Sequence, residues 1–271
     1  MNELLILSIA FVVLTLIGVP LFAAVGLTTA LALFLIDIPY TLLAQTGYNS
    51  LTPFPLLTIP LFVLAGRLME TGGMANRMIG IATKLVGAYR GSMGLVTVFA
   101  CMLFGALSGS GPATTAAIGS ATVPAMKKEG YDVPFAAAIT ASAGALGSLI
   151  PPSNLMIIYG LVSETSIPRL FLAGIIPGFI VTTLLMMTTY IIARRRGYGG
   201  GGDPFTWGPF LQAAWEGKWS IGAPVLILGG IYGGIFTPTE AAGVAVFYAL
   251  FVGLFIYREL TGRKEIGRAH V

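Results

Sequence analysis

Charged residues are scarce in this sequence. Asp, Glu, Lys and Arg make up only 10% of its 271 residues, whereas a soluble protein carries about 25%. Hydrophobic residues account for 56% of the chain, and its mean hydropathy is +0.88. This composition excludes an ordinary soluble domain and predicts an all-α polytopic membrane protein.

Cysteine and histidine are almost absent as well. Cys101 is the single cysteine and lies in an apolar stretch, so we expect neither a disulfide framework nor a cysteine metal site. His270 is the single histidine, and no charged residue occurs within residues 91–126 or 135–162. Intramembrane catalysis would need a buried Ser–Lys pair, a histidine or paired carboxylates. We therefore predict a protein that is not an enzyme and that uses no cofactor or transition metal.

The net charge of +4 is explained by the orientation of the chain in a membrane and does not indicate nucleic-acid binding. Basic residues cluster at the ends of apolar stretches, as they do on the cytoplasmic side of membrane helices. Of the 15 Lys and Arg residues, only Arg169 falls on the outer face of the predicted topology, and the other fourteen face inward. The acidic residues assigned to the outer face are Glu3, Asp37, Glu164 and Glu240.

The most informative stretch is the uncharged segment at residues 91–126. Apolar helices are expected over residues 92–107 and 112–126, each about 15 residues long and shorter than the roughly 20 that cross a membrane. Both ends have basic flanks: Lys84, Arg90, Lys127 and Lys128. If both flanks face the cytoplasm, the segment enters the membrane and turns back as a re-entrant hairpin.

The tip of this hairpin is the polar sequence Ser108-Gly-Ser-Gly-Pro-Ala-Thr-Thr115. Non-helical backbone persists at membrane depth only where it is buried in protein or lines a wet cavity. The tip is therefore the first candidate for a ligand site.

A second interruption follows at similar predicted depth. Residues 135–162 read as a membrane helix rich in Ala and Gly, broken by Pro151-Pro152-Ser153-Asn154. Two consecutive prolines remove two backbone donors and release carbonyl groups from the helical ladder. We call residues 151–154 the break.

Further elements are expected along the chain. Residues 54–68 and 168–193 are predicted crossings, and the second ends at three arginines, 194–196. Residues 37–55 read as a polar connection and residues 197–203 as a Gly-rich linker. Two stretches are typical of interfacial helices: residues 72–90, which are amphipathic, and residues 205–219, which carry Trp207, Trp215 and Trp219.

The first 36 residues leave two alternatives. Residues 3–18 and 21–36 are apolar stretches separated by Gly18-Val19-Pro20, and they form either one long kinked helix or two short crossings. Two crossings would give five crossings plus a hairpin before Arg196, and residues 220–257 would mirror residues 4–36 upside down. Inverted repeats are typical of transporters, so we prefer two crossings.

The two interruptions offer neutral oxygens to an ion. Unwound carbonyls and hydroxyls can coordinate a hard cation such as sodium, and the helix beginning near Pro112 can face an anion with its N-terminus. The alternative is that small residues only allow close packing of helices, and that Asn154 only caps the helix after the break. The candidate sodium- and substrate-binding residues are Ser108, Gly109, Ser110, Gly111, Thr114, Thr115, Ser148, Pro151, Ser153 and Asn154.

The last seven residues, 265–271, depart from the apolar pattern. They back-translate as GAG-ATC-GGA-AGA-GCA-CAC-GTC, which contains the start of a common sequencing adapter. We therefore expect the natural chain to stop near Lys264 in a fragmentary gene, with the mirrored unit cut off, and we assign no role to His270. The same seven residues followed by a stop codon in an intact genomic copy would refute this.

At the level of motifs, the chain resembles the large membrane subunit (DctM-type permease) of tripartite ATP-independent periplasmic (TRAP) transporters. The resemblance covers residues 1 to about 264. The residues that carry it are the tip with its continuation to Gly119, Val123-Pro-Ala-Met126, Gly130-Tyr-Asp132, Ile150-Pro-Pro-Ser153, Ile157-Ile-Tyr-Gly160, Gly234 to Ala242, and Tyr257-Arg-Glu-Leu-Thr261. Gly111 occupies a tip position where the family often has serine.

The resemblance implies a sodium-driven symporter of the elevator type that imports a C4-dicarboxylate or related organic-acid anion across the bacterial inner membrane. It also implies two partners, a small four-helix membrane subunit and a periplasmic substrate-binding protein. By position, the tip and residues 148–154 would form one sodium site and half of the substrate site. The family's second hairpin is missing from these residues, so we do not expect them to transport alone.

The resulting prediction is an elevator-type inverted-repeat fold, similar to the ion transporter superfamily, with the first repeat and the start of the second. Its predicted parts are scaffold helices with an interfacial helix (1–90), a transport unit (91–196), a linker with an interfacial helix (197–219) and the second repeat (220–264). A membrane assembly or anchoring protein remains the alternative function. In that case the tip and the break would serve packing only.

Overall fold

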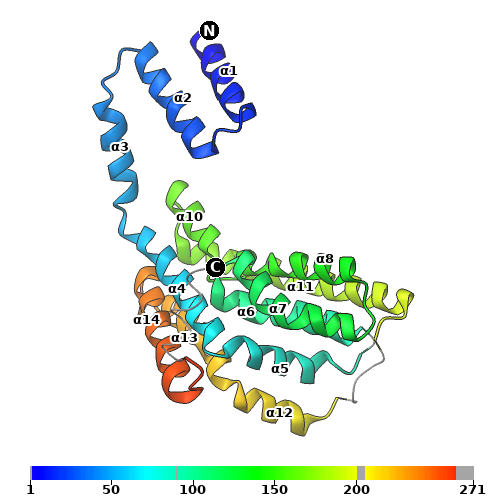
Figure 1. The fold of residues 1–271 in the computed structure, drawn as a ribbon. Coiled ribbons are helices and arrows are strands. Elements are labelled where there is room, and N and C mark those ends of the chain that lie inside the picture. The colour runs from blue at the N-terminus through cyan, green and yellow to red at the C-terminus, as the bar shows by residue number, and fades with distance from the viewer. Residues whose placement is uncertain (1, 90, 200–204, 261–271) are drawn as a thin grey trace. The chain divides into compact units, whose positions relative to one another are not determined.

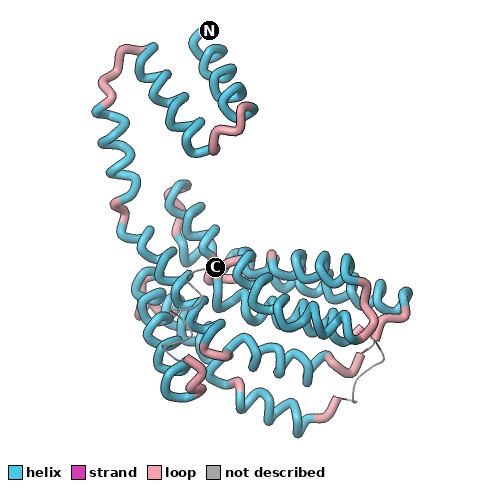
Figure 2. The backbone as a smooth tube through the Cα atoms, viewed as in Figure 1, coloured by secondary structure: helices cyan, strands magenta, loops and turns pink. Residues whose placement is uncertain are grey.

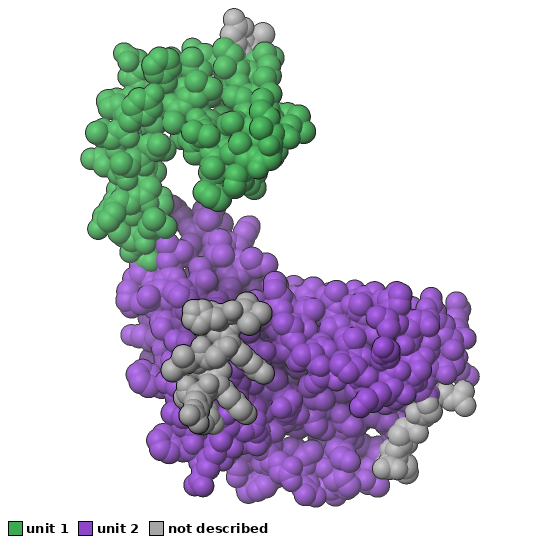
Figure 3. Space-filling model, viewed as in Figure 1, with its two compact units in different colours: residues 1–53 green, residues 54–271 purple. Residues whose placement is uncertain are grey.

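The computed structural model describes residues 2–89, 91–199 and 205–260, and every regular element in these ranges is helical (Figure 1, Figure 2). The chain divides into two compact units, residues 1–53 and 54–271 (Figure 3). This is a division by packing. The functional division into scaffold and transport unit stays a prediction, and the proposed adapter segment at residues 265–271 lies outside the described residues, as do residues 200–203 of the linker.

The first unit begins with a helical hairpin. Helices α1 (Asn2–Leu16) and α2 (Leu21–Leu35) lie side by side. The chain reverses between them through Gly18, whose φ of +88° is in the left-handed region. Two separate helices therefore form here, in place of one kinked helix.

The polar connection predicted at residues 37–55 contains a helix that the sequence analysis missed. Helix α3 (Thr41–Leu51) occupies most of it, and none of its residues is buried. Its Gly and polar residues made the stretch resemble a loop, but no proline falls between Thr41 and Leu51 to interrupt the helical hydrogen bonds.

The second unit contains the longest apolar helices. The short 3-10 turn η1 (Phe54–Leu57) runs into α4 (Thr58–Thr71), α11 spans Ile167–Arg196, and α14 (Pro238–Phe251) continues into the π-helical turn η2 (Val252–Ile256). By length and composition, three helical segments in the described ranges can cross a membrane, or four if a bent pair forms one span. The chain is thus an all-helical protein with several membrane-compatible helices.

The hairpin and the broken helix both have the predicted form. Helices α6 (Ser92–Ser108) and α7 (Gly111–Lys128) pack against each other, joined by two residues. Helix α8 (Val133–Gly144) continues into the short α9 (Leu146–Leu149), and α10 (Asn154–Val162) follows the break at an angle of 47°. Whether the hairpin re-enters from one side of a membrane stays a prediction.

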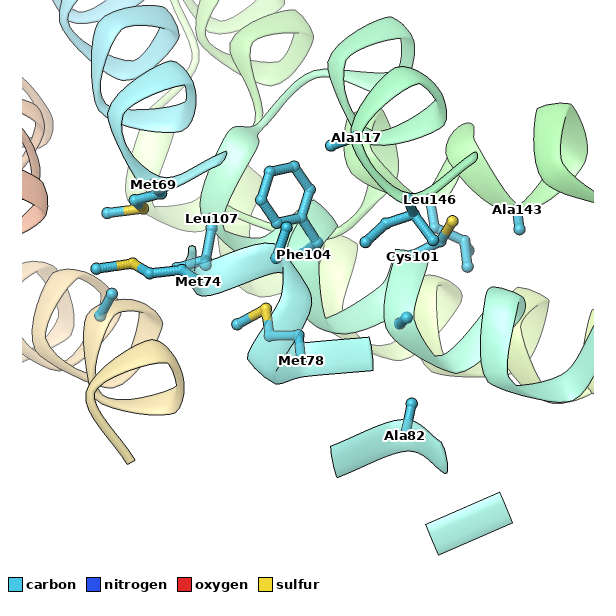
Figure 4. Close-up of a cluster of buried hydrophobic side chains, with 14 of the residues drawn as sticks. Met69, Met74, Met78, Ala82, Cys101, Phe104, Leu107, Ala117, Ala143 and Leu146 are labelled. Carbon is cyan, nitrogen blue, oxygen red and sulfur yellow. The ribbon is translucent and has the colours of Figure 1, made fainter. Parts of the chain in front are cut away.

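The amphipathic helix α5 (Met74–Val86) turns its apolar face toward protein. Met74 and Met78 are buried beside Phe104 and Leu107 of α6, as Figure 4 shows. Helix α12 (Trp207–Glu216) also packs against α5. The apolar side of α5 therefore packs mainly against neighbouring helices.

The tryptophan-rich segment is divided between two helices, contrary to the prediction of one helix over residues 205–219. Helix α12 ends at Glu216, and α13 (Lys218–Tyr232) begins directly after Gly217 with Trp219 in its first turn. Gly217 breaks the helical run because glycine is a poor helix former. Trp207 and Trp215 are 68% and 69% exposed, as expected of aromatic residues at a membrane surface.

Helices α4 and α14 form a close pair at one side of the second unit. Their first turns are joined by a buried hydrogen bond of 2.7 Å between the hydroxyl groups of Thr58 and Thr239. Helix α14 begins with a capping box, in which Thr237 accepts a hydrogen bond from the Glu240 amide and the Glu240 carboxylate accepts one from the Thr237 amide.

Candidate functional site

The hairpin tip is a tight turn between two helix ends. Helix α6 ends at Gly109, whose φ of +59° is left-handed, and Ser110 is the extended N-cap of α7. The Ser110 hydroxyl accepts a hydrogen bond from the Ala113 amide at 3.5 Å. Pro112 lies in the first turn of α7, where a missing amide hydrogen costs nothing.

Hydroxyl groups of the tip point into the protein. The side chains of Ser108 and Thr114 form a hydrogen bond of 2.7 Å, and these residues are only 2% and 0% exposed. The Thr115 hydroxyl donates to the Gly111 carbonyl of its own helix at 2.9 Å. Three of the predicted tip oxygens are thus held by local hydrogen bonds.

The break is capped by serine. The Ser153 hydroxyl donates to the Ser148 carbonyl at 2.5 Å and accepts from the Met156 amide at 3.5 Å, which makes Ser153 the N-cap of α10. Pro151 and Pro152 are buried. The alternative role considered for Asn154, capping this helix, is therefore filled by Ser153.

The tip and the break are in direct contact. The backbone N–H of Asn154 donates a hydrogen bond to the Gly109 carbonyl at 3.0 Å. The backbone N–H of Gly111 donates one to the Ser148 hydroxyl at 3.1 Å. A Cβ on Gly109 would lie 2.7 Å from the Pro152 carbonyl oxygen, so only glycine permits this approach. The structure thus brings together all ten predicted residues at one place in the fold.

Two glycines that the sequence analysis did not select also shape this contact. A Cβ on Gly147 would lie 2.3 Å from the Thr114 hydroxyl oxygen, and one on Gly144 would overlap the Thr115 side chain. The signal for them was the small-residue pattern Ala-Gly-Ala-Leu-Gly before the break, which we interpreted only as general helix packing.

Asn154 has an unusual environment. Its side-chain oxygen Oδ1 is buried and has no hydrogen-bond partner in the described part of the chain. A buried acceptor without a donor costs roughly 1–3 kcal/mol. Such a group at the contact between tip and break is a candidate ligand for a cation or a hydrogen-bond donor.

The electrostatics of the site come from dipoles rather than charges. No Asp, Glu, Lys or Arg occurs in residues 91–126 or 135–162. Helices α7 and α10 both begin at the site, so their amide ends carry partial positive charge there. Carbonyl and hydroxyl oxygens lie beside these amide ends, so the site presents partial charges of both signs.

The far end of the hairpin is held by an aromatic and polar cluster. The Tyr131 ring stacks on Tyr198 with centroids 4.7 Å apart, and the Gly94 amide donates to the Tyr131 hydroxyl at 3.4 Å. Tyr198 also donates to Asp132, which forms a 3.2 Å ion pair with Arg196 at the end of α11. The base of the hairpin is thereby tied to α11.

Comparison with known proteins identifies the family. The family model described as "Tripartite ATP-independent periplasmic transporter, DctM component" matches residues 8–269. The chain belongs to this family. The resemblance noted from the motifs is therefore confirmed, and DctM-family proteins are transporter permeases rather than enzymes.

Individual relatives agree with the family match. The isethionate TRAP transporter permease protein DctMQ of Oleidesulfovibrio alaskensis is 44% identical over 253 residues, which cover 93% of this chain and 40% of that protein. The C4-dicarboxylate TRAP transporter large permease protein DctM of Vibrio cholerae is 44% identical over 258 residues, covering 94% of this chain and 56% of that protein.

A third relative is named for another substrate. The 2,3-diketo-L-gulonate TRAP transporter large permease protein YiaN of Escherichia coli is 42% identical over 250 residues, covering 90% of this chain and 58% of that protein. This chain spans about half the length of these DctM-family relatives.

Proposed function

We propose that this chain forms part of the large permease subunit of a sodium-coupled secondary transporter. Its substrate is a C4-dicarboxylate or a related organic-acid anion. The proposal is supported by membership of the DctM family and by the names of relatives such as the Vibrio cholerae permease. The activity belongs to the complete permease, since these residues correspond to about half of it.

The observation that carries the proposal is the contact between tip and break. The Gly109–Asn154 and Gly111–Ser148 hydrogen bonds hold two non-helical segments together among apolar helices. Sodium is coordinated by unwound carbonyls and hydroxyls in transporters built from broken helices, and anionic substrates face helix N-termini. Both kinds of group are present here, at Ser108 to Thr115 and at Ser148 to Asn154.

The movement that accompanies binding is of the elevator type in this proposal. Helices α6 to α11 form the moving unit, and α4 with α14 belong to the scaffold. The protein lies in the bacterial inner membrane. It pairs with a small four-helix membrane subunit and receives substrate from a periplasmic binding protein.

The test is uptake of labelled C4-dicarboxylate by the complete permease with both partners in proteoliposomes. We expect uptake with a sodium gradient and none with a choline gradient. The combined variant Ser110→Ala, Thr114→Val and Asn154→Ala should lower uptake at least about ten-fold, because each lost oxygen contact is worth roughly 1 kcal/mol.

The matched control carries the same three changes at exposed positions, Ser120→Ala, Thr183→Val and Asn49→Ala. It should transport as the unaltered permease does. Full uptake by the tip and break variant would leave these residues with a packing role only. No uptake by any of these proteins, with or without a sodium gradient, would favour the alternative function, an assembly or anchoring protein.

A further inference from the structure

An apolar cavity that is open on one side lies in the second unit, separate from the hydroxyl groups of the site. Its volume is about 260 Å³, and every residue lining it is apolar. Met78 of α5, Ala106 of α6 and Phe179 of α11 form three of its walls, and Ile150 and Pro151 contribute at the edge of the break.

The size and lining of the cavity fit an apolar ligand. An apolar cavity of about 150 Å³ in another protein stays dry and binds benzene, and this one is larger. Water would find no hydrogen-bond partner on these walls. Beside α11, which is long and apolar enough to cross a membrane, the apolar ligand present at high concentration is the acyl chain of a lipid.

The position of the cavity along α13 fits one leaflet of a bilayer. Ile221, Pro224 and Leu228 line it from one face of this helix. The helix begins at Lys218, and ten residues from Lys218 to Leu228 rise about 15 Å. That is half of the roughly 30 Å hydrocarbon core, so a chain entering beside Lys218 would end near the middle of the membrane.

Lys218 provides a cation at the end of this path that lies at the membrane surface. Its ammonium group lies 3.6 Å from the centroid of Trp215 and 5.9 Å from that of Trp219. The adjacent Gly217 lies against Ile81 of α5, one turn from Met78, which places the start of α13 next to the cavity wall.

The surroundings of Lys218 favour a phosphate. Tryptophan rings are typical of the membrane–water interface, where lipid phosphates lie. The nearby Glu216 carboxylate accepts a hydrogen bond from Gln212, one turn back along α12. Lysine near an anionic membrane surface contributes to lipid binding.

We infer that this cavity and Lys218 form a binding site for one anionic phospholipid, with an acyl chain in the cavity and the phosphate at the Lys218 ammonium. The site does not depend on the transport proposal. Because Pro151 is part of its wall, the lipid lies against the break from its apolar side.

The experiment uses the 271-residue chain, purified in detergent and titrated with dioleoyl phosphatidylglycerol under native mass spectrometry. One lipid should remain bound. Ala106→Phe, which fills the cavity, should abolish retention. Lys218→Gln should weaken it about five-fold. The matched controls Ala137→Phe and Lys84→Gln, at exposed positions, should retain the lipid as the unaltered chain does.

Folding is followed in the same samples with a thiol-reactive dye, because Cys101 is the single cysteine and is 0% exposed. If Ala106→Phe does not show a cooperative unfolding transition in the labelling of Cys101, Ala106→Leu replaces it, and loss of lipid retention is again the expected result. Full retention by a folded cavity variant overturns the acyl-chain site. Equal binding of phosphatidylcholine, or unchanged affinity in Lys218→Gln, overturns the phosphate contact. Competition by soluble glycerophosphoglycerol would mean that phosphate binds without the cavity, which also overturns the inference.

Discussion

Gly109 is the residue at which the two interruptions meet. Its carbonyl accepts a hydrogen bond from the backbone N–H of Asn154. Its left-handed φ of +59° turns the chain from α6 toward α7. The Pro152 carbonyl oxygen occupies the space where a side chain would begin. One residue without a side chain therefore satisfies a backbone turn and a close contact at once.

Replacing this glycine should separate tip from break. In Gly109→Ala, the left-handed conformation costs about 1–2 kcal/mol, and the new Cβ would also displace the Pro152 carbonyl. The expected result is a clear loss of thermal stability, measured by dye labelling of Cys101. The control Gly130→Ala has a φ of +83° but no atom within 4 Å of its Cβ, so it should lose less. Equal losses would contradict the role of the contact.

At this scale the sequence predicted residue types better than residue roles. It selected Ser153 and Asn154 together. Only the structure distinguishes the capping hydroxyl of Ser153 from the side-chain oxygen of Asn154, which has no hydrogen-bond partner among the described residues. It missed Gly144 and Gly147 because their importance depends on which helix faces them. Such pairings across the fold leave no periodic signal in a single sequence.

Among the elements, α4 and α14 depend on one buried polar contact. The hydroxyl groups of Thr58 and Thr239 are 2.7 Å apart, and the two residues are 0% and 5% exposed. We expect Thr58→Val to lower the free energy of unfolding by about 1–3 kcal/mol, because it leaves the Thr239 hydroxyl buried without its partner.

The double variant Thr58→Val with Thr239→Val should recover part of this loss, since both polar groups are then removed. A double-variant cycle of thermal or denaturant unfolding measures the difference. Thr183→Val, at an exposed position on α11, is the control. Strictly additive losses would mean that the two hydroxyl groups do not interact.

Helix α7 ends at an acidic residue with an altered pKa. Glu129 directly follows the last turn of α7. Partial burial of its carboxyl group raises its pKa above the ordinary value. Hydrogen bonds with the Ser92 side chain and the Met93 backbone act in the opposite direction and offset only part of this rise. A raised folded-state pKa stabilises the fold at pH values below the unfolded-state pKa. The contribution is lost as the pH rises through the folded-state value.

Glu129→Gln should therefore match the unaltered protein near pH 4 and be slightly more stable at pH 7. The measurement is the thermal midpoint as a function of pH. The matched variant Glu164→Gln, at an exposed position in the turn after α10, is measured alongside. A profile of Glu129→Gln that parallels the unaltered one would contradict this assignment.

Element boundaries near proline and glycine were predictable. The arms of the hairpin were expected over residues 92–107 and 112–126, and α6 and α7 span Ser92–Ser108 and Gly111–Lys128. The break appears where two prolines end the helical ladder. Helix α3 was missed and the segment of α12 and α13 was wrongly joined, because neither a short polar helix nor a single Gly217 gives a strong signal.

For the whole molecule, charge predicts orientation. Lys127 lies at the predicted inner end of α7 and Ser163 at the predicted outer end of α10, and both are exposed. The unaltered chain has one cysteine, Cys101, which is buried. It is therefore a suitable background for single-cysteine labelling.

In intact spheroplasts, a membrane-impermeant maleimide should label Ser163→Cys and should not label Lys127→Cys. After permeabilisation both should react. The unaltered chain is the control and should react only after unfolding. The opposite labelling pattern would contradict the orientation derived from the basic residues.

The hairpin of α6 and α7 is fastened at both of its ends, by Asn154 at the tip and by Tyr131, Tyr198 and Arg196 at the base. Because both of its ends are held by hydrogen bonds and ring stacking, the hairpin resists bending along its length. A spectroscopic label at either end of the hairpin therefore reports the displacement of the other end.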